Sequence, residues 1–243
     1  MAMSNILLKE VTMGLFLLIS YDGSSLSHYE SQSLPSQLET LFFSQICSII
    51  PTMKLQKLYS KVRQALDDYN MITENDKIAI GVSGGKDSLT LLYALSGIRS
   101  FYPVPFELVA IAVDLGYDDF DLEPVKALCD ELSVEFYVVK TDIGRISLEK
   151  SKNQASPCSW CAKLRKGALN DFALSVGCNK IAYAHHMDDI IETMFLSLLY
   201  EGQFYSFAPV TQLDGSGLTI IRPLMYVGES DVKGFKNKYN LPV

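Results

Sequence analysis

A glycine-rich segment between a predicted strand and a predicted helix has the composition of a phosphate-binding loop. The first amides and the dipole of a helix favour an anion at this place. Glycines let the main chain approach phosphate oxygens, serine hydroxyls and a lysine supply donors and charge, and an aspartate could hold magnesium. The spacing matches neither a Walker A loop nor Gly-x-Gly-x-x-Gly. We therefore expect a distinct phosphate site formed by Ser83, Gly84, Gly85, Lys86, Asp87 and Ser88.

Two cysteines three residues apart form a second candidate site. Cys158 and Cys161 lie in a Pro-Cys-Ser-Trp-Cys segment, with three basic residues following at the head of a helix predicted over 161–176. Such surroundings favour thiolates, so these thiols are candidates for reactivity. Zinc would need four ligands, and there is no second Cys-x-x-Cys, although histidines or another chain could contribute. A redox pair, an iron–sulfur cluster and two structural cysteines are the other interpretations.

Two adjacent histidines and two carboxylates form the third candidate site. His185 and His186 follow a predicted strand, and Asp188 and Asp189 begin a helix predicted over 188–200. Carboxylates at a helix start can simply cap it. The neighbouring histidines favour a role in nucleotide binding, magnesium binding or proton transfer.

Alternating strands and helices are expected to position these three segments. Apolar runs predict strands over 78–82, 108–113, 136–139 and 181–184, and the other predicted helices follow the glycine-rich segment and cover 121–132. This alternation is typical of an α/β fold with a parallel sheet flanked by helices. Ligands bind such sheets at the carboxyl ends of the strands, where the first and third segments fall.

Length and composition indicate an ordinary globular chain of one catalytic domain with an extension. The 243 residues are 48% hydrophobic and 20% charged, which excludes fibrous, repeat, disordered and transmembrane-bundle classes. Five cysteines, an odd number, favour a reduced compartment, so we expect a cytoplasmic protein. Residues 1–52 are Ser-rich and carry no legible chemistry, whereas Met53 opens an amphipathic helix pattern and is a candidate translation start. The expected boundaries are therefore 1–52 and 53–243.

The charge is unevenly distributed along the chain. The net charge of −7 disfavours a general nucleic-acid coating role. Residues 140–180 nevertheless contain eight basic and three acidic residues, which suits contacts with RNA phosphates. A second basic group lies on the helix expected near residue 54, where a solvated helix face is the alternative: Lys54, Lys57, Lys61 and Arg63.

The three segments together resemble the tRNA 2-thiocytidine synthetase family, a sulfurtransferase branch of the PP-loop ATP pyrophosphatases. The resemblance covers residues 54–243 and includes SGGKDS at 83–88, CSWC at 158–161, HHMDDIIET at 185–193 and IRPL at 221–224. It implies a Rossmann-like fold of the adenine-nucleotide alpha-hydrolase type. It also implies that Val113 and Asp114 lie near the adenosine of ATP.

The resemblance further implies a reaction, cofactors and partners. In this family, ATP adenylates cytidine 32 of tRNA at its C2 oxygen, and sulfur replaces that oxygen at a 4Fe-4S cluster. By the resemblance, Cys158 and Cys161 are cluster ligands, Asp188 is catalytic, Asp87 binds magnesium, and His185 and Asp189 complete the ATP site. The implied partners are tRNA and a sulfur donor such as a cysteine desulfurase. A homodimer is one option, and no membrane partner is expected.

One part of the family pattern is missing. The family's third cluster cysteine lies beyond the segment that ends here at Val243, and Cys178 does not correspond to it. We therefore expect either a fragment or an incomplete cluster. Two alternatives stay open: a lysidine-synthetase-like tRNA ligase, which shares the phosphate loop and His-His-x-Asp-Asp but needs no Cys-x-x-Cys, and a non-catalytic nucleotide-binding or metal-binding homologue.

Overall fold

The computed structural model describes residues 55–117, 121–151, 156–213 and 215–243. The chain divides into two units, Met1–Ile49 and Ile50–Val243, and all described residues belong to the second. The expected extension over 1–52 and the candidate start at Met53 lie outside the described residues. Among the described helices, none combines the length and apolar character that crossing a membrane requires.

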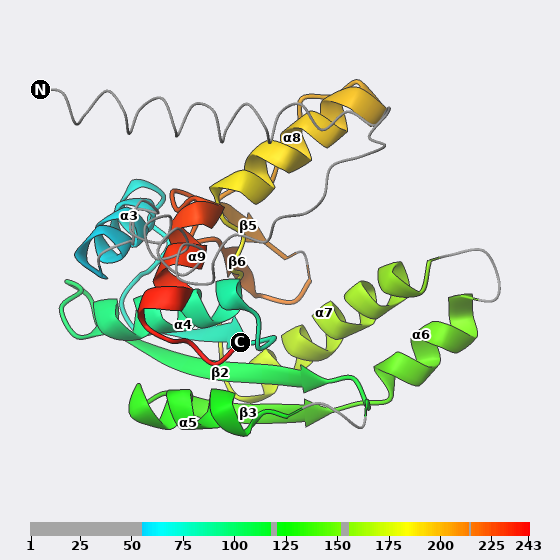
Figure 1. Cartoon of the computed structure of the whole chain (residues 1–243), viewed down its shortest axis with the longest axis horizontal. Helices are drawn as coiled ribbons and strands as arrows, with labels where there is room; N and C mark the ends of the chain where they lie inside the picture. Colours follow the sequence, from blue (N-terminus) through cyan, green and yellow to red (C-terminus); the bar gives the residue numbers. More distant parts are fainter. Residues whose placement is uncertain (1–54, 118–120, 152–155, 214) are drawn as a thin grey trace, which may run out of the picture. The chain divides into compact units, whose positions relative to one another are not determined.

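A six-stranded sheet forms the centre of the second unit (Figure 1). The order is β3-β2-β1-β4-β6-β5, and neighbouring strands are parallel except for the antiparallel pair β5 and β6. This confirms the predicted parallel sheet, while the two short strands of the β5–β6 pair offered no apolar run long enough to predict. The strands are β1 (Asp76–Gly81), β2 (Phe106–Asp114), β3 (Glu135–Lys140), β4 (Lys180–Ala182), β5 (Val210–Gln212) and β6 (Thr219–Ile221).

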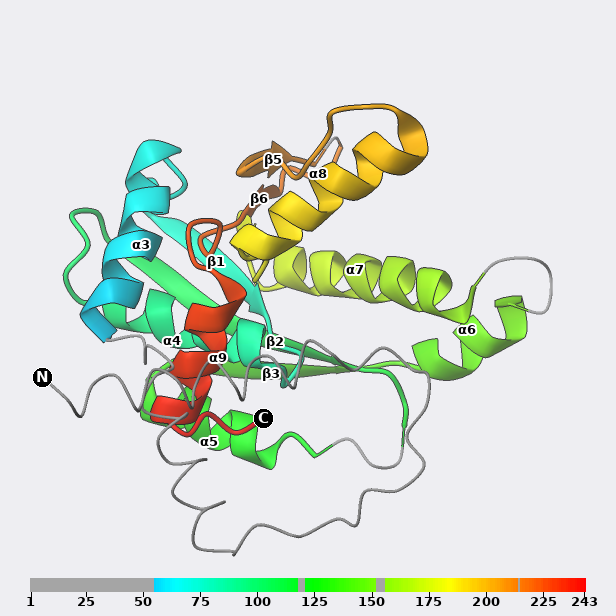
Figure 2. The ribbon, with the colours of Figure 1, turned by 45° about the horizontal axis from the view of Figure 1, so that its top comes forward.

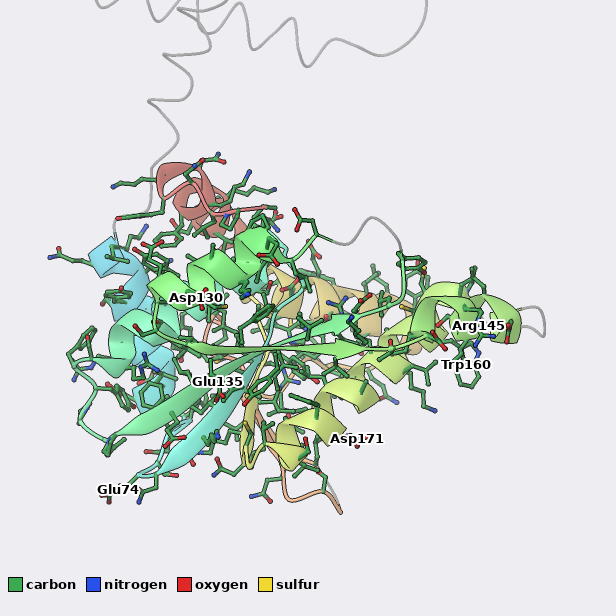
Figure 3. The ribbon with its side chains drawn as sticks, turned by 90° about the horizontal axis from the view of Figure 1, so that it is seen from below. Glu74, Asp130, Glu135, Arg145, Trp160 and Asp171 are labelled. Atoms are coloured by element: carbon green, nitrogen blue, oxygen red, sulfur yellow. The ribbon has the colours of Figure 1, made fainter. Side chains whose placement is uncertain are left out.

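Helices cover both faces of this sheet. Alternate residues of a strand point to opposite faces. Ile78 and Ile80 of β1 accordingly join the core beneath α3, α4, α5 and α9, whereas Ala79 joins a second core beneath α7. Figure 3 shows α5 and α7 on opposite sides of β3. The helices are α3 (Leu55–Asp68), α4 (Lys86–Arg99), α5 (Glu123–Glu131), α6 (Ile143–Ser151), α7 (Pro157–Ser175), α8 (Met187–Glu201) and α9 (Glu229–Lys238).

The sheet has a topological switch point between β1 and β4. The chain runs from β1 towards β2 and β3 on one side and places β4, β6 and β5 on the other. The loop after β1 and the loop after β4 therefore leave the same edge of the sheet side by side. This is the place where doubly wound sheets bind ligands.

Helix α7 begins four residues earlier than the sequence pattern predicted. Ser156 is its N-cap and Pro157 stands in its first turn. Proline is favoured there because its fixed φ suits a helix and its missing N–H would have no helical partner. Cys158 therefore lies within the first turn of α7 rather than before it, and Cys161 lies one turn further along the helix.

A buried ion pair ties β1 to β4. Lys180 Nζ lies 2.6 Å from Asp76 Oδ2 and donates to the carbonyl oxygen of Met71 at 2.9 Å. Burial by itself would raise the pKa of Asp76, but hydrogen bonds from Lys180, Thr73 and Asn179 outweigh it and lower the pKa below its ordinary value. Lys180 is thus a structural cation, and counting it in the basic region for RNA was wrong.

Asp76→Asn should destabilise the fold by about 3–5 kcal/mol at pH 7, because it leaves the buried charge of Lys180 without an opposite charge, with the carbonyl oxygen of Met71 as its remaining acceptor. Urea denaturation measures the effect. Glu107→Gln is the control, because it removes the exposed pair with Lys77 at 3.9 Å and should cost less than about 1 kcal/mol. Since folding lowers the pKa of Asp76, its stabilisation is present above about pH 4 and is lost as the pH falls further. Equal losses in both variants at pH 7 would contradict this prediction.

Candidate active site

The phosphate-loop residues close a tight turn between β1 and α4. The main-chain N–H of Ser83 donates to Ser88 Oγ at 3.2 Å, and that hydroxyl donates to the carbonyl oxygen of Gly85 at 3.0 Å. Gly84 has a φ of +77°, which explains the requirement for glycine there. Gly85 is the N-cap of α4 and brings no side-chain cap. The first amides of α4 are therefore available to an anion.

Two carboxylates hold the loop lysine at this helix end. Lys86 Nζ lies 3.0 Å from Asp87 Oδ2 and 3.3 Å from Glu229 Oε1, which comes from the start of α9. Burial would lower the pKa of Lys86, but its hydrogen bonds to Asp87 and Glu229 outweigh it and raise the pKa. The lysine therefore stays positively charged beside the loop. Glu229 was not predicted, because no local pattern links it to a loop more than a hundred residues earlier in the chain.

The histidine and carboxylate segment forms the N-terminus of α8. His186 Nδ1 accepts from the main-chain N–H of Asp189 at 3.3 Å, and Asp189 Oδ2 accepts from the N–H of His186 at 2.8 Å. Asp188 Oδ2 accepts from the N–H of Glu229 at 2.6 Å, at the start of α9. Asp189 thus caps its own helix, as the structural alternative expected, whereas Asp188 accepts from the first N–H of α9 instead. Their catalytic and ATP-binding roles stay predictions.

His186 connects this cap to the phosphate loop. It is 6% exposed, and its Nε2 lies 3.8 Å from Asp87 Oδ1. Because Nδ1 accepts a main-chain hydrogen bond, the proton of the neutral ring lies on Nε2, on the side of Asp87. The two segments predicted separately from the sequence therefore meet at the switch point.

A cavity of about 490 Å³ opens beside the loop at the carboxyl ends of β1, β2 and β4. Three of the predicted site residues line this cavity: Ser83, Val113 and His185. Asp114 lies outside its lining, and its Oδ1 accepts from the N–H of Gly116 in the turn after β2. The full lining is Gly81, Val82, Ser83, Ile111, Val113, Ala162, Arg165, Lys166, Leu169, Tyr183, His185, Phe207 and Arg222.

One wall of the cavity was not predicted from the sequence. The rings of His185 and Phe207 stack with centroids 4.5 Å apart and planes 10° apart, and Arg222 lies 5.3 Å from the Phe207 centroid. Burial, followed by the charge of Arg222, lowers the pKa of His185 below its ordinary value. The sequence marked residues 221–224 as a motif without a role, and nothing in the pattern distinguished Phe207.

The two candidate thiols lie one helical turn from the cavity lining. Cys158 is exposed and Cys161 is partly exposed, and both are free. Residues four positions apart share a helix face, so Cys158 adjoins Ala162 and Cys161 adjoins Arg165, both of which line the cavity. This end of α7 lies at the outer end of the α6–α7 pair, where Figure 3 labels Trp160 of α7 and Arg145 of α6.

The other described cysteines lie away from this pair. Burial raises the pKa of Cys129 to about 11 and also raises that of Cys178. Cys178 follows the opposite end of α7, which is roughly 28 Å long at 1.5 Å per residue. Within the described ranges, no cluster of three or more Cys, His, Asp or Glu forms a metal-binding group.

Of the described cations expected to contact RNA, five form ion pairs within the chain: Lys57, Lys61, Arg63, Arg145 and Lys180. Lys57 and Lys61 lie 3.3 and 2.8 Å from Asp231 and tie α3 to α9, which neither the RNA contact nor the solvated helix face predicted. Arg145 pairs with acidic residues of α6 and its N-cap region. The basic side chains along α7 are Lys163, Arg165 and Lys166, and Lys163 Nζ lies 5.8 Å from the Trp160 ring centroid. Lys54, Lys152 and the side chain of Lys150 lie outside the described part.

Two solved structures share the fold. One is the U34-tRNA thiolase NcsA from Methanococcus maripaludis with its 4Fe-4S cluster, with a TM-score of 0.58 and 24% identity over 76% of this chain and 63% of that chain. This chain thus matches less than two thirds of the thiolase's length. The other is an NH3-dependent NAD synthetase from Campylobacter jejuni, with a TM-score of 0.51 and 16% identity over 78% of this chain and 75% of that one.

Sequence comparisons define the family. A PP-loop domain matches residues 53–242. A tRNA-cytidine(32) 2-sulfurtransferase from Syntrophotalea carbinolica is 40% identical over 189 residues, which are 78% of this chain and 72% of the relative. The same enzyme from Geobacter sulfurreducens is 38% identical over 194 residues, 80% of this chain and 76% of the relative. The loop at the switch point is therefore a PP loop, and the chain belongs to the tRNA-cytidine(32) 2-sulfurtransferase family of PP-loop enzymes.

Proposed function

We propose that the protein thiolates cytidine 32 of tRNA to 2-thiocytidine in an ATP-dependent reaction. The observation that carries the proposal is that a PP loop and a pair of accessible thiols adjoin one cavity, the loop through Ser83 and the thiols through the next turn of α7. A lysidine-synthetase-like ligase would need the loop and the histidines but not the thiols. Family membership supports the choice of tRNA and of position 32.

The first proposed step is adenylation. The amides at the start of α4, together with Ser83 and Lys86, bind the phosphates of ATP. The C2 oxygen of cytidine attacks the α-phosphorus, an O–P bond forms, and pyrophosphate leaves. Val113 lies on the cavity wall at the end of β2, where the adenosine is proposed to bind.

Magnesium fits the loop in this proposal. Magnesium is usually held by one or two carboxylates together with phosphate oxygens and water, so it does not require a preformed cage of side chains. The carboxylate of Asp87 is about one third exposed beside the loop and suits such a role. Bound magnesium would neutralise charge that develops on the leaving pyrophosphate.

The second proposed step replaces the activated oxygen with sulfur. A sulfide attacks C2, the C–O bond breaks, and AMP leaves with the former C2 oxygen. Cys158 and Cys161 fit a 4Fe-4S cluster, because they are two free, accessible thiols on one helix face. Among the described residues, no third Cys, His, Asp or Glu forms a metal-binding group with them. When bound, such a cluster would supply an iron open to exogenous sulfur. Arg165 and Lys166 would neutralise the phosphate of the leaving AMP or of tRNA.

The same proposal includes a sulfur donor, such as a cysteine desulfurase. It also includes a reducing, cytoplasmic compartment, because free thiols persist there.

The test of the first step is pyrophosphate release from ATP under anaerobic conditions with unmodified tRNA. We expect release that depends on tRNA and that Cys158→Ala retains, because the loop lies apart from the thiols. A nucleotide-binding homologue without catalysis would release no pyrophosphate, and that result would overturn the proposal.

A further inference from the structure

Arg222, which follows β6, is held in place by three directed contacts. It is 7% exposed, and its Nη1 donates to the carbonyl oxygen of Ala208 and to Thr211 Oγ1 at 3.1 Å. Its Nε donates to His185 Nδ1 at 3.3 Å. The guanidinium therefore joins the segment after β4, which carries His185, to β5 and to the segment that leads into it. Figure 2 shows β5 and β6 side by side. No role for this buried arginine follows from the PP loop or from the thiols.

The contact with Arg222 determines the tautomer of His185. A guanidinium has five donors and no acceptor, so the Nδ1 atom that faces it must be the acceptor. An Nδ1 that accepts carries no proton, and the neutral imidazole then has its proton on Nε2. An imidazolium would donate from both nitrogens and could not form this contact.

The surroundings of the ring keep it neutral and fix its plane. Arg222, Lys166 and His186 disfavour the imidazolium, Asp189 favours it, and the Tyr183 ring lies 5.8 Å away. Burial is the largest cause that lowers the pKa of His185. The stack with Phe207 sets the ring plane, so that the ring has one orientation with Nδ1 towards Arg222.

The opposite ring nitrogen is open to the cavity. Within the described part of the chain, His185 Nε2 has no hydrogen-bond partner. It is also not a fully buried atom, because the described buried side-chain atoms without a partner are Ser147 Oγ, Asn170 Oδ1 and Tyr183 OH. Because His185 lines the cavity and its Nε2 is not a buried atom without a partner, we infer that Nε2 faces the cavity. Ser83, the first residue of the PP loop, lines the same cavity.

We propose that Arg222 is a positioning residue that keeps the proton of His185 on Nε2, so that this histidine donates a hydrogen bond to a phosphate oxygen of bound ATP and does not act as a base. The proposal deepens the proposed function and rests on it only for the identity of the accepting oxygen. The tautomer itself follows from the contact between two side chains of this chain.

The tautomer can be measured in the whole protein without turnover. The chain has three histidines, His28, His185 and His186, so long-range proton–nitrogen NMR spectra can be assigned with single His→Gln variants. We expect the nitrogen shifts of His185 to show a neutral, Nε2-protonated ring from pH 6 to 8. A ring protonated on Nδ1 in that range would overturn the proposal.

Two variants, Arg222→Lys and Thr211→Val, distinguish positioning of the His185 ring by Arg222 from a general loosening of the segment around Arg222. Arg222→Lys removes the Nε donor, so we expect a mixture of tautomers or a ring that titrates between pH 6 and 8 in a folded protein. Thr211→Val removes a contact of Nη1 but not of Nε, so the nitrogen shifts should stay as in the wild type. Unchanged shifts in folded Arg222→Lys would also overturn the proposal.

Substitution of His185 tests the donor role by rescue. Glutamine can place an N–H near the position of Nε2, whereas leucine cannot donate. We expect His185→Leu to reduce kcat/KM for ATP about 10- to 100-fold and His185→Gln to stay within about fivefold of the wild type. Equal losses would contradict the donor role. Because the NMR result needs no reaction, a failure of the thiolation proposal would leave the tautomer measurement interpretable.

Discussion

Cys158→Ala should reduce formation of 2-thiocytidine at least about 100-fold while ATP binding stays within about twofold of the wild type. The thiol lies in the first turn of α7, one turn from the cavity, whereas the PP loop and the cap of α8 belong to other elements. Its loss should therefore remove sulfur delivery without disturbing the nucleotide. Nucleoside analysis of tRNA and equilibrium binding of an ATP analogue measure the two effects.

Cys178→Ala is the matched control for this prediction. Cys178 is buried beyond the opposite end of α7, so its loss should leave thiolation within about twofold after correction for the folded fraction. The single tryptophan, Trp160, lies between the two candidate ligands and reports on iron through quenching of its fluorescence. We expect quenching on anaerobic iron and sulfide loading of the wild type and of Cys178→Ala, but not of Cys158→Ala. Full thiolation by Cys158→Ala would contradict the cluster assignment.

Lys86→Met should reduce kcat/KM for tRNA-dependent pyrophosphate release about 100- to 1,000-fold, because it removes the positive charge beside the developing charge of the leaving group. In the free protein, Asp87 and Glu229 hold this lysine at the start of α4. The variant leaves these two carboxylates without their shared cation, which should also repel the phosphates of ATP. Initial rates at several ATP concentrations measure both effects.

Lys233→Met provides a control with the same change in charge. Lys233 Nζ lies 2.9 Å from Glu229 Oε2, on the exposed side of the same carboxylate. It has no contact with the PP loop within the described residues, so its loss should change the rate less than about threefold. If both variants lost activity equally, the effect would come from Glu229 or from net charge, and the assigned role of Lys86 would be wrong.

The sequence predicted the parts of the fold that depend on local pattern. Buried parallel strands are continuous apolar runs, and the run at 78–82 lies within one or two residues of the ends of β1 (Asp76–Gly81). The PP loop was equally legible, because a glycine at positive φ and an uncapped helix start are local requirements. The early start of α7 was not predicted, since proline occurs in loops as well as in the first turn of a helix.

Contacts between distant segments could not be predicted in the same way. The pairing of His185 with Arg222 and the approach of Glu229 to Lys86 arise only when β4, β6 and α9 assemble around the switch point. Charge counting failed for a related reason. Lys61 and Lys180 resemble solvent-exposed cations in the sequence, but the fold uses both in ion pairs with Asp231 and Asp76.

The most direct test of the proposed function is nucleoside mass spectrometry of tRNA that lacks 2-thiocytidine. The tRNA is incubated anaerobically with the iron- and sulfide-loaded protein, ATP, magnesium and a sulfide source. We predict 2-thiocytidine at position 32, formed only when ATP is present and with one AMP and one pyrophosphate for each base modified. Pyrophosphate release without any thiolated cytidine, or lysine incorporated in its place, would contradict the assignment of this chain as a tRNA sulfurtransferase.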